Sequence, residues 1–279
     1  MNRKTTIFQR VEHGTGAKVV ESFGRSAMQR ASVGGRAVLL FLDSIHQLPQ
    51  TGRVMPQLFR QIEICGIGSI FVLALIAFLT GMIMALQTGS ELAKFGAQAN
   101  LGAIIGATFV REFGPIWAAI IMLSRVGAAM AAELGTMAVN EEIDALRVMN
   151  INPVRFLVLP RMLALIIAMP LLTVIADYVG MFGGGLVAAQ VFNRPPEEFL
   201  ESARGILGNV DFYSGLVKSM VFGALIATIA CDRGLHTIDG AEGVGRSTNQ
   251  TVVSAVVCVL IANLIMTGFV QQILKPVVE

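Results

Sequence analysis

Charged residues are scarce in this chain of 279 residues, of which Asp, Glu, Lys and Arg together make up only 14%. A soluble globular domain carries about 25% of these residues. Hydrophobic residues reach 54%, and the mean hydropathy is +0.68. The composition therefore excludes a soluble enzyme and predicts an integral membrane protein. The length allows five or six spans with short loops and leaves no room for a large soluble domain.

Cysteine and histidine are equally scarce, with three of each. Cys65, Cys231 and Cys258 lie within or at the ends of apolar segments, at spacings that fit no metal site. We interpret them as small packing residues. The histidines lie outside the apolar segments, at positions 13, 46 and 236. Metal-dependent hydrolysis inside the membrane, which needs histidine ligands there, is therefore disfavoured.

The sequence also lacks an ATP site and the apolar core of a signal peptide. Gly240 to Ser247 has the spacing of a phosphate-binding loop, but Arg246 stands where lysine belongs and no strand precedes it. We interpret this stretch as a flexible turn between spans. No cofactor is expected on this chain, and energy for any work that it does must come from a partner or an ion gradient.

Five apolar segments predict membrane spans. They lie at about 64–86, 101–123, 162–182, 216–231 and 252–274. The first holds 23 residues without a charge, enough to cross about 30 Å of hydrocarbon. Three connecting segments are expected to be loops: 124–161, 192–215 and 232–251.

The N-terminal part is expected to lie at the membrane surface. Residues 1–30 form a basic extension, either a solvated tail or a contact for anionic headgroups or a partner. Residues 32–49 contain an apolar core too short to span, which predicts an interfacial helix ending at Pro49. The fold class is therefore an all-α integral membrane protein. Residues 31–279 are expected to form a single domain of this interfacial helix, five transmembrane helices and a short cytoplasmic helix at 140–149.

Basic residues indicate the orientation, because cytoplasmic segments are enriched in lysine and arginine. Nine lie in residues 1–63, four in 124–161 and two in 232–251, all on one side if the N-terminus is cytoplasmic. The opposite side receives only Lys94, Arg194, Arg204 and Lys275. The C-terminus is then expected outside. Two GxxxG pairs, Gly102 with Gly106 and Gly180 with Gly184, predict close helix packing and are compatible with a dimer.

Arg111 and Glu112 are the strongest signal within a span, because ionisable groups are costly in lipid and must face protein or water. Adjacent helical residues point about 100° apart, so the two need not pair with each other. Glu112 could meet Lys218, or Arg111 of another subunit. The pair is either part of a substrate cavity or a structural clamp between helices. Asp177 and Asn263 are weaker candidates.

Residues 140–149 predict a short amphipathic helix, with Asn140 as its cap and Glu141 and Glu142 at its positive end. Its apolar ridge consists of Ile143, Leu146 and Met149. Asn152-Pro153 ends it. This ridge packs either on the protein's own membrane face or in a groove of a soluble subunit.

Several motifs together resemble the MlaE/YrbE family, the permease subunits of ABC transporters that work with MCE-domain proteins. They are REFGP at 111–115, AELGTM at 132–137, EEIDAL at 141–146, Asn152-Pro153 and LPR at 159–161. The resemblance covers about residues 35–275 and does not reach the N-terminal extension. It implies an interfacial helix, five spans and pairing with a second copy. The expected location is the bacterial inner membrane.

The resemblance also implies partners and site residues. An ATPase subunit that holds ATP and Mg²⁺ binds a coupling helix, here 140–149 with Glu141, Glu142, Ile143, Asp144, Leu146 and Met149. A periplasmic MCE protein exchanges phospholipid with the permease, and a STAS-domain subunit joins some complexes. Arg111 and Glu112 correspond to cavity residues, and Met84, Leu92 and Phe95 are expected to line the lipid pocket.

The alternative is an ion- or proton-coupled secondary transporter with Glu112, Asp177 and Lys218 as its relay. Such transporters are built from repeated sets of spans. Five spans do not divide evenly and the chain shows no internal repeat, which favours the permease. Neither interpretation involves nucleic acid.

Overall fold

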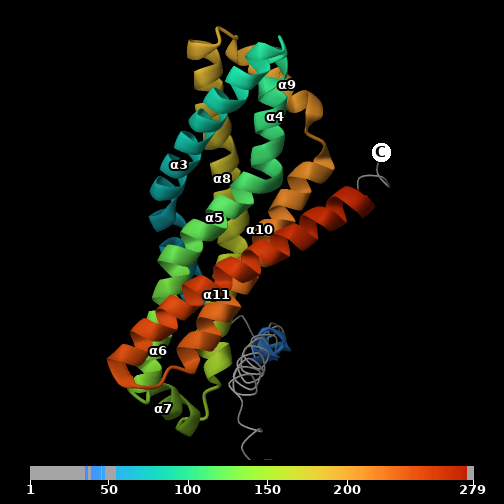
Figure 1. The fold of residues 1–279 in the computed structure, drawn as a ribbon. Coiled ribbons are helices and arrows are strands. Elements are labelled where there is room, and N and C mark those ends of the chain that lie inside the picture. The colour runs from blue at the N-terminus through green and yellow to red at the C-terminus, as the bar shows by residue number, and fades with distance from the viewer. Residues whose placement is uncertain (1–34, 37–38, 45, 48–54, 275–279) are drawn as a thin grey trace, which may run out of the picture.

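The computed structural model describes residues 35–36, 39–44, 46–47 and 55–274. All regular structure within these residues is helical, and five helices are long and apolar enough to cross a membrane (Figure 1). They are Met55–Lys94, Gln98–Val139, Val154–Val191, Asn209–Leu235 and Gly240–Gln272. The predicted all-α membrane fold with five spans is confirmed.

Each of these helices contains labelled elements. The first is α3 (Met55–Lys94). The second joins η2 (Gln98–Asn100), α4 (Leu101–Thr108), the π-helical turn η3 (Phe109–Phe113), α5 (Gly114–Met122), the π-helical turn η4 (Leu123–Gly127) and α6 (Ala128–Val139). After α7 (Glu142–Val148) follow η5 (Val154–Val158) and α8 (Leu159–Val191). The chain ends with α9 (Pro196–Ile206), α10 (Asn209–Leu235), α11 (Gly240–Phe269) and η6 (Val270–Leu274).

The helices are longer than the apolar segments that predicted them, because hydropathy detects only the part of a helix that lies in lipid. Most of the predicted loop 124–161 is helical, and 192–215 contains α9. The flexible turn predicted at 240–247 is wrong, because these residues form the first two turns of α11. Pro196 in the first turn of α9, followed by Glu197 and Glu198, is a start signal that marks this helix in the sequence.

The N-terminal predictions are described only in part. The extension 1–30 lies outside the described residues. Within 32–49, residues 39–44 are helical, and Leu40 packs against residues of α6, α7 and α10.

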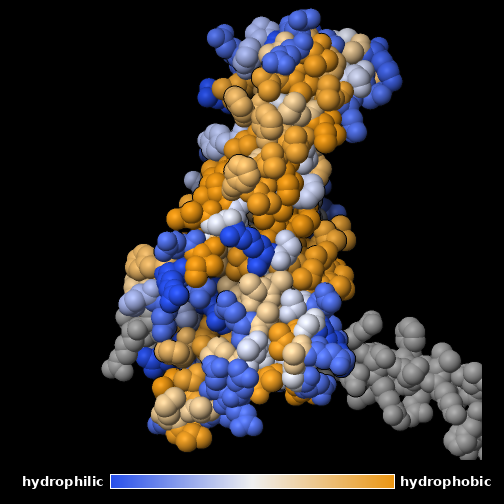
Figure 2. Space-filling model, turned by 90° about the vertical axis from the view of Figure 1, so that its left-hand side faces the viewer, coloured by the Kyte–Doolittle hydropathy of each residue, from blue (hydrophilic) through white to orange (hydrophobic). Residues whose placement is uncertain are grey.

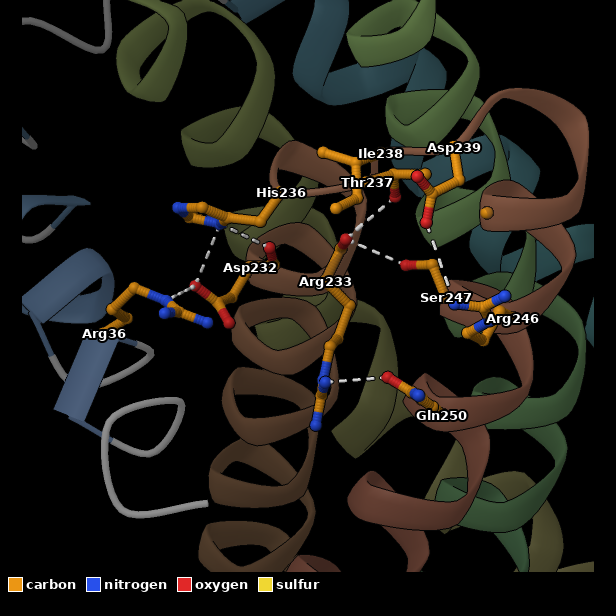
Figure 3. Close-up of a pocket in the computed structure, with 11 residues that line it drawn as sticks. Arg36, Asp232, Arg233, His236, Thr237, Ile238, Asp239, Arg246, Ser247 and Gln250 are labelled. Atoms are coloured by element: carbon orange, nitrogen blue, oxygen red, sulfur yellow. Dashed lines mark hydrogen bonds and ion pairs between the residues drawn. The ribbon is translucent and has the colours of Figure 1, made fainter. Parts of the chain in front are cut away.

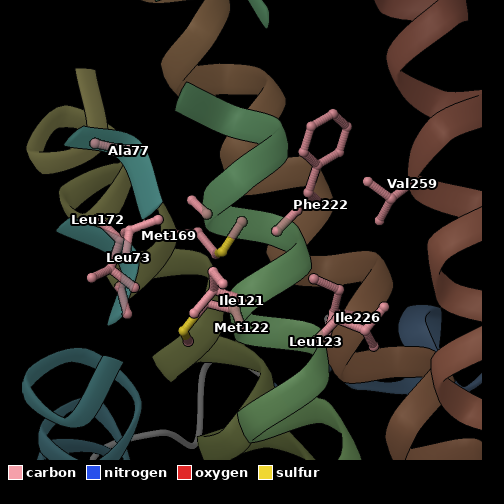
Figure 4. Close-up of a cluster of buried hydrophobic side chains, with 14 of the residues drawn as sticks. Leu73, Ala77, Ile121, Met122, Leu123, Met169, Leu172, Phe222, Ile226 and Val259 are labelled. Carbon is pink, nitrogen blue, oxygen red and sulfur yellow. The ribbon is translucent and has the colours of Figure 1, made fainter. Parts of the chain in front are cut away.

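The core lies where α8 packs between α3 and α10 (Figure 4). Labelled there are Leu73 and Ala77 of α3, Met169 and Leu172 of α8, Ile121 and Met122 of α5, Leu123 of η4, Phe222 and Ile226 of α10, and Val259 of α11. Glycines let the backbones approach closely. A Cβ on Gly81 would collide with the Gly180 carbonyl, and one on Gly102 with the Phe199 carbonyl of α9. The predicted glycine packing is confirmed, although Gly102 serves α9 rather than another span.

α11 packs least. Only 11% of its most apolar window is buried, against 61% for the span that contains α8. Figure 1 shows its C-terminal end leaving the bundle. In the view of Figure 2, hydrophobic residues cover most of the upper half, whereas polar residues gather at the top and in the lower half. A bilayer covers exposed hydrophobic surface of this kind, and α7 lies at the lower end of the molecule, away from α9.

We expect Gly81→Ala to destabilise the protein by about 1–3 kcal/mol, because the added methyl group must displace the Gly180 backbone. Gly66→Ala on the same helix is the control, since a Cβ there meets nothing within 4 Å. Its effect is expected to be neutral or slightly stabilising. Thermal unfolding in detergent measures both. Equal stability of the two variants would contradict the tight α3–α8 contact.

Candidate functional site

A cluster of charged side chains lies inside the bundle where η3, α10 and α11 meet, and Glu112 is at its centre. Glu112 Oε1 accepts hydrogen bonds from Lys218 Nζ at 2.9 Å and Thr267 Oγ1 at 2.8 Å. Its Oε2 accepts one from Asn263 Nδ2 at 2.7 Å. One carboxylate therefore links the second span to α10 and α11.

Lys218 is the buried member of this cluster, with 2% of its side chain exposed. Its ammonium also donates to Thr267 Oγ1 at 2.7 Å and to the Arg111 carbonyl at 2.8 Å. That carbonyl is available because Pro115, four residues later, has no N–H to donate to it. The sequence Arg-Glu-Phe-Gly-Pro thus provides both a carboxylate and a free carbonyl for one lysine.

Arg111 pairs elsewhere. Its Nη2 lies 2.8 Å from Asp211 Oδ2, and that oxygen also accepts the Gly208 N–H at 3.3 Å at the start of α10. Arg111 and Glu112 therefore each have their own counter-ion, Asp211 and Lys218, on α10. Sequence analysis missed Asp211, although Asp211 and Lys218 share a helix face at a spacing of seven residues.

The two pairs balance to zero net charge, as ionisable groups within a bundle must. Lys218 and Asp211 are 2% and 4% exposed, whereas Glu112 and Arg111 keep 29% and 30% of their side chains exposed. The two α10 residues are thus buried, whereas the two residues singled out in the sequence are partly exposed. A polar headgroup that approaches this space meets one cation and one anion.

Asp177 is separate from this cluster. It is buried on α8 against Gly114, where a Cβ would collide with its carboxylate. Its Oδ1 has no hydrogen-bond partner among the described residues. The predicted relay of Glu112, Asp177 and Lys218 is therefore not assembled. Glu112 and Lys218 are in contact, but Asn263 and Thr267, not Asp177, complete the cluster.

The three residues predicted to line a lipid pocket lie near the C-terminal end of α3 and not in the charged cluster. Met84 and Leu92 are half-buried and pack against the core. Phe95, just after the helix, is 81% exposed. The structure thus makes Phe95 accessible and uses the other two partly for packing.

α7 lies at the opposite end of the molecule from α9 (Figure 1). It begins at Glu142, after Glu141 in a left-handed conformation with φ 60°, and Asn150 after the helix has the same φ. The predicted cap by Asn140 is wrong: this residue ends α6, where its N–H donates to the Thr136 carbonyl.

The predicted apolar ridge of α7 is divided between two surroundings. Ile143 is 4% exposed in a cluster with Leu134 and Cys231, and Leu146 packs against that cluster. Met149 is 61% exposed, and the neighbouring Val148 is 88% exposed. The first alternative therefore holds for Ile143 and Leu146, which pack on the chain itself, whereas a contact of Met149 with a soluble subunit stays a prediction.

A small cavity of about 260 Å³ lies near α7, at the α10–α11 turn (Figure 3). Asp232, almost fully buried, is flanked by Arg36 Nε at 3.6 Å and His236 Nδ1 at 3.3 Å. Arg246, at the lysine position of the phosphate-loop-like stretch, contacts Asp239 and Glu242 instead. These contacts hold the N-terminal region and the turn in place.

Comparison with known proteins gives consistent matches. A family profile described as Permease MlaE matches residues 58–269. A probable ABC transporter permease protein of Rickettsia felis is 34% identical over 89% of this chain and 96% of its own length. One of Synechocystis sp. is 35% identical over 76% and 81%. The chloroplastic protein TRIGALACTOSYLDIACYLGLYCEROL 1 of Arabidopsis thaliana is 36% identical over 76% of this chain and 61% of its own length.

We expect Lys218→Met to lower the free energy of unfolding by about 3 kcal/mol, because it leaves Glu112 as an unpaired charge within the bundle. Adding Glu112→Gln removes that charge, and the double variant is expected to recover most of the loss. Thermal unfolding followed by the fluorescence of the single tryptophan, Trp117, measures this. A double variant no more stable than Lys218→Met would show that the pair does not interact.

Proposed function

The chain belongs to the MlaE permease family of ABC transporters, and we propose that it moves phospholipid between the inner membrane and a periplasmic MCE protein. The plant relative supports a lipid substrate, because its name contains that of a glycerolipid. The observation that carries the proposal is the half-open charged cluster. Arg111 and Glu112 keep 30% and 29% of their side chains exposed within a largely apolar bundle, and an amphiphile needs both a polar and an apolar surface along its path.

We propose that Arg111 and Glu112 contact the lipid headgroup. A guanidinium binds phosphate through paired hydrogen bonds, and a carboxylate accepts from amine or hydroxyl groups. Lys218 and Asp211 hold these side chains in place from α10. Phe95 and the apolar residues near it, Met84 and Leu92, are proposed as contacts for the acyl chains.

α7 is proposed as the contact for the ATPase subunit, which holds ATP and Mg²⁺. Its exposed end offers Val148 and Met149, beside the acidic Glu141, Glu142 and Asp144. Ile143 seats the helix on a cluster that includes Leu134 of α6 and Cys231 of α10. A displacement of α7 therefore reaches the two helices that lead to the charged cluster through direct packing.

The remaining assembly is proposed from the resemblance together with the structure. The exposed apolar surface of α11 is suited to a second copy of the chain, so that two charged clusters face one cavity. With α7 cytoplasmic, the N-terminus is cytoplasmic, and α9 lies at the periplasmic end with the MCE protein. A STAS-domain subunit stays a prediction. ATP rather than an ion gradient is the energy source proposed, because Asp177 does not join Glu112 and Lys218.

We expect Met149→Asp and Val148→Asp to weaken binding of the ATPase subunit by at least about tenfold, because each places a charge in an apolar contact. Co-purification of the two subunits measures this. Ile238→Asp is the matched control: this residue is 72% exposed on the α10–α11 turn at the same end of the molecule. Ile143→Asp is unsuitable as a test of binding, because it disrupts the seat of α7. An intact complex with both α7 variants would contradict the coupling role.

We expect the double variant Glu112→Gln with Lys218→Met to lose about tenfold or more of its lipid transfer while it stays folded. Both charges are removed together, so the variant separates a headgroup contact from a structural clamp. ATP-dependent transfer of a fluorescent phospholipid from proteoliposomes to the MCE protein is the measurement. Transfer at the wild-type rate would assign the cluster to structure alone.

A further inference from the structure

A second apolar surface lies away from the charged cluster, in a groove between α8 and α9. Its volume is about 460 Å³, within the range of small-molecule sites. The walls include Phe182 and Leu186 of α8 and Leu200 of α9, and the floor holds the small residues Gly185 and Ala189. Phe182 is 68% exposed, so the groove opens to the surroundings of the protein. This residue lies in Val154–Val191, a helix long and apolar enough to cross a membrane.

Arg204 is the charged residue that lines this groove. It is exposed, and no ion pair or hydrogen bond to it occurs within the described residues. Arg194, in the turn before α9, differs in this respect because it pairs with Glu198 at 3.2 Å. An arginine beside lipid-facing apolar side chains is stabilised when it reaches an anion, and lipid phosphate is the anion that a bilayer supplies.

A groove between α3 and α8 provides an internal comparison. It is larger, about 610 Å³, and equally apolar, but the charged residue that lines it is Glu63. A carboxylate repels phosphate. The two grooves therefore both fit hydrocarbon, and they differ in the sign of the charge beside it.

We propose that the α8–α9 groove binds a glycerophospholipid from the surrounding bilayer, with its phosphate on the Arg204 guanidinium and an acyl chain along Phe182 and Leu186. A guanidinium matches phosphate geometry with paired hydrogen bonds. A partner helix fits less well: a cylinder about 10 Å wide that rises 1.5 Å per residue fills roughly 120 Å³ per residue, so the groove would hold about four residues. This lateral site is independent of the transport path proposed above.

Photolabelling in lipid nanodiscs tests the proposal with two probes that carry the same diazirine acyl chain. One is phosphatidylglycerol and the other is neutral diacylglycerol, each at low fraction in phosphatidylcholine. Mass spectrometry then locates the adducts on the full chain. We expect phosphatidylglycerol to label the α8–α9 groove about tenfold more than diacylglycerol does. At the α3–α8 groove, we expect phosphatidylglycerol to label no more than diacylglycerol.

Three variants sharpen the result. Arg204→Gln is expected to reduce the ratio of the two probes at the α8–α9 groove to about one, because the charge-assisted contact is lost. Arg194→Gln, a nearby but paired arginine, is expected to leave it unchanged. Ala189→Trp fills the floor and is expected to lower labelling by both probes.

Three outcomes would overturn the site. They are a probe ratio near one in the wild type, a ratio that Arg204→Gln does not change, and the absence of phosphatidylglycerol adducts from the α8–α9 groove, which is the result if a protein chain covers it. Size-exclusion elution and unfolding temperature show whether each variant is folded. Lipid transfer is not the readout, so a failure of the proposed transport function leaves this result interpretable.

Discussion

The architecture depends on one ammonium group held inside the membrane bundle. Lys218 is satisfied by three oxygen atoms from two other helices: the Glu112 carboxylate, the Thr267 hydroxyl and the Arg111 carbonyl. The last acceptor exists because Pro115 cannot donate to it. Removing water from a lysine is costly unless all its donors are filled, so this contact fixes how η3, α10 and α11 meet. It also joins the C-terminal part of α11, whose most apolar stretch is otherwise little buried, to the bundle.

Close glycine contacts complement this polar junction. Gly81 and Gly180 bring the backbones of α3 and α8 into close contact, while the polar junction joins the other side of the bundle. α7 rests on α6 and α10, both of which continue toward the charged cluster. The packing therefore divides the molecule into a closely packed α3–α8 wall and a part that a few charges hold together. A permease that responds to a soluble partner needs such a division.

The sequence alone predicts those features of the fold and the site that depend on the chemistry of neighbouring residues. The number of spans follows from hydropathy. Lys218 was predicted as a possible partner of Glu112, and Asn263 as a polar residue within a span, because polar groups in lipid must pair with one another. Asp211 was missed because it lies in what was predicted to be a loop. The turn of α7 that faces the bundle is set by tertiary contacts of Ile143, which periodicity alone cannot orient. The predicted helix ends were too early or too late because hydropathy marks only the part of a helix in lipid, whereas the helix continues into water as long as its backbone hydrogen bonds are kept.

The length of α3 has a consequence for anything that travels along it. Its 40 residues span about 60 Å, twice the roughly 30 Å of hydrocarbon in a bilayer. α8 runs beside it for most of that distance. Part of this wall must then stand in water or among headgroups. A molecule that follows this wall past the end of the hydrocarbon still touches the chain, so leaving the bilayer interior and leaving the protein are two separate events.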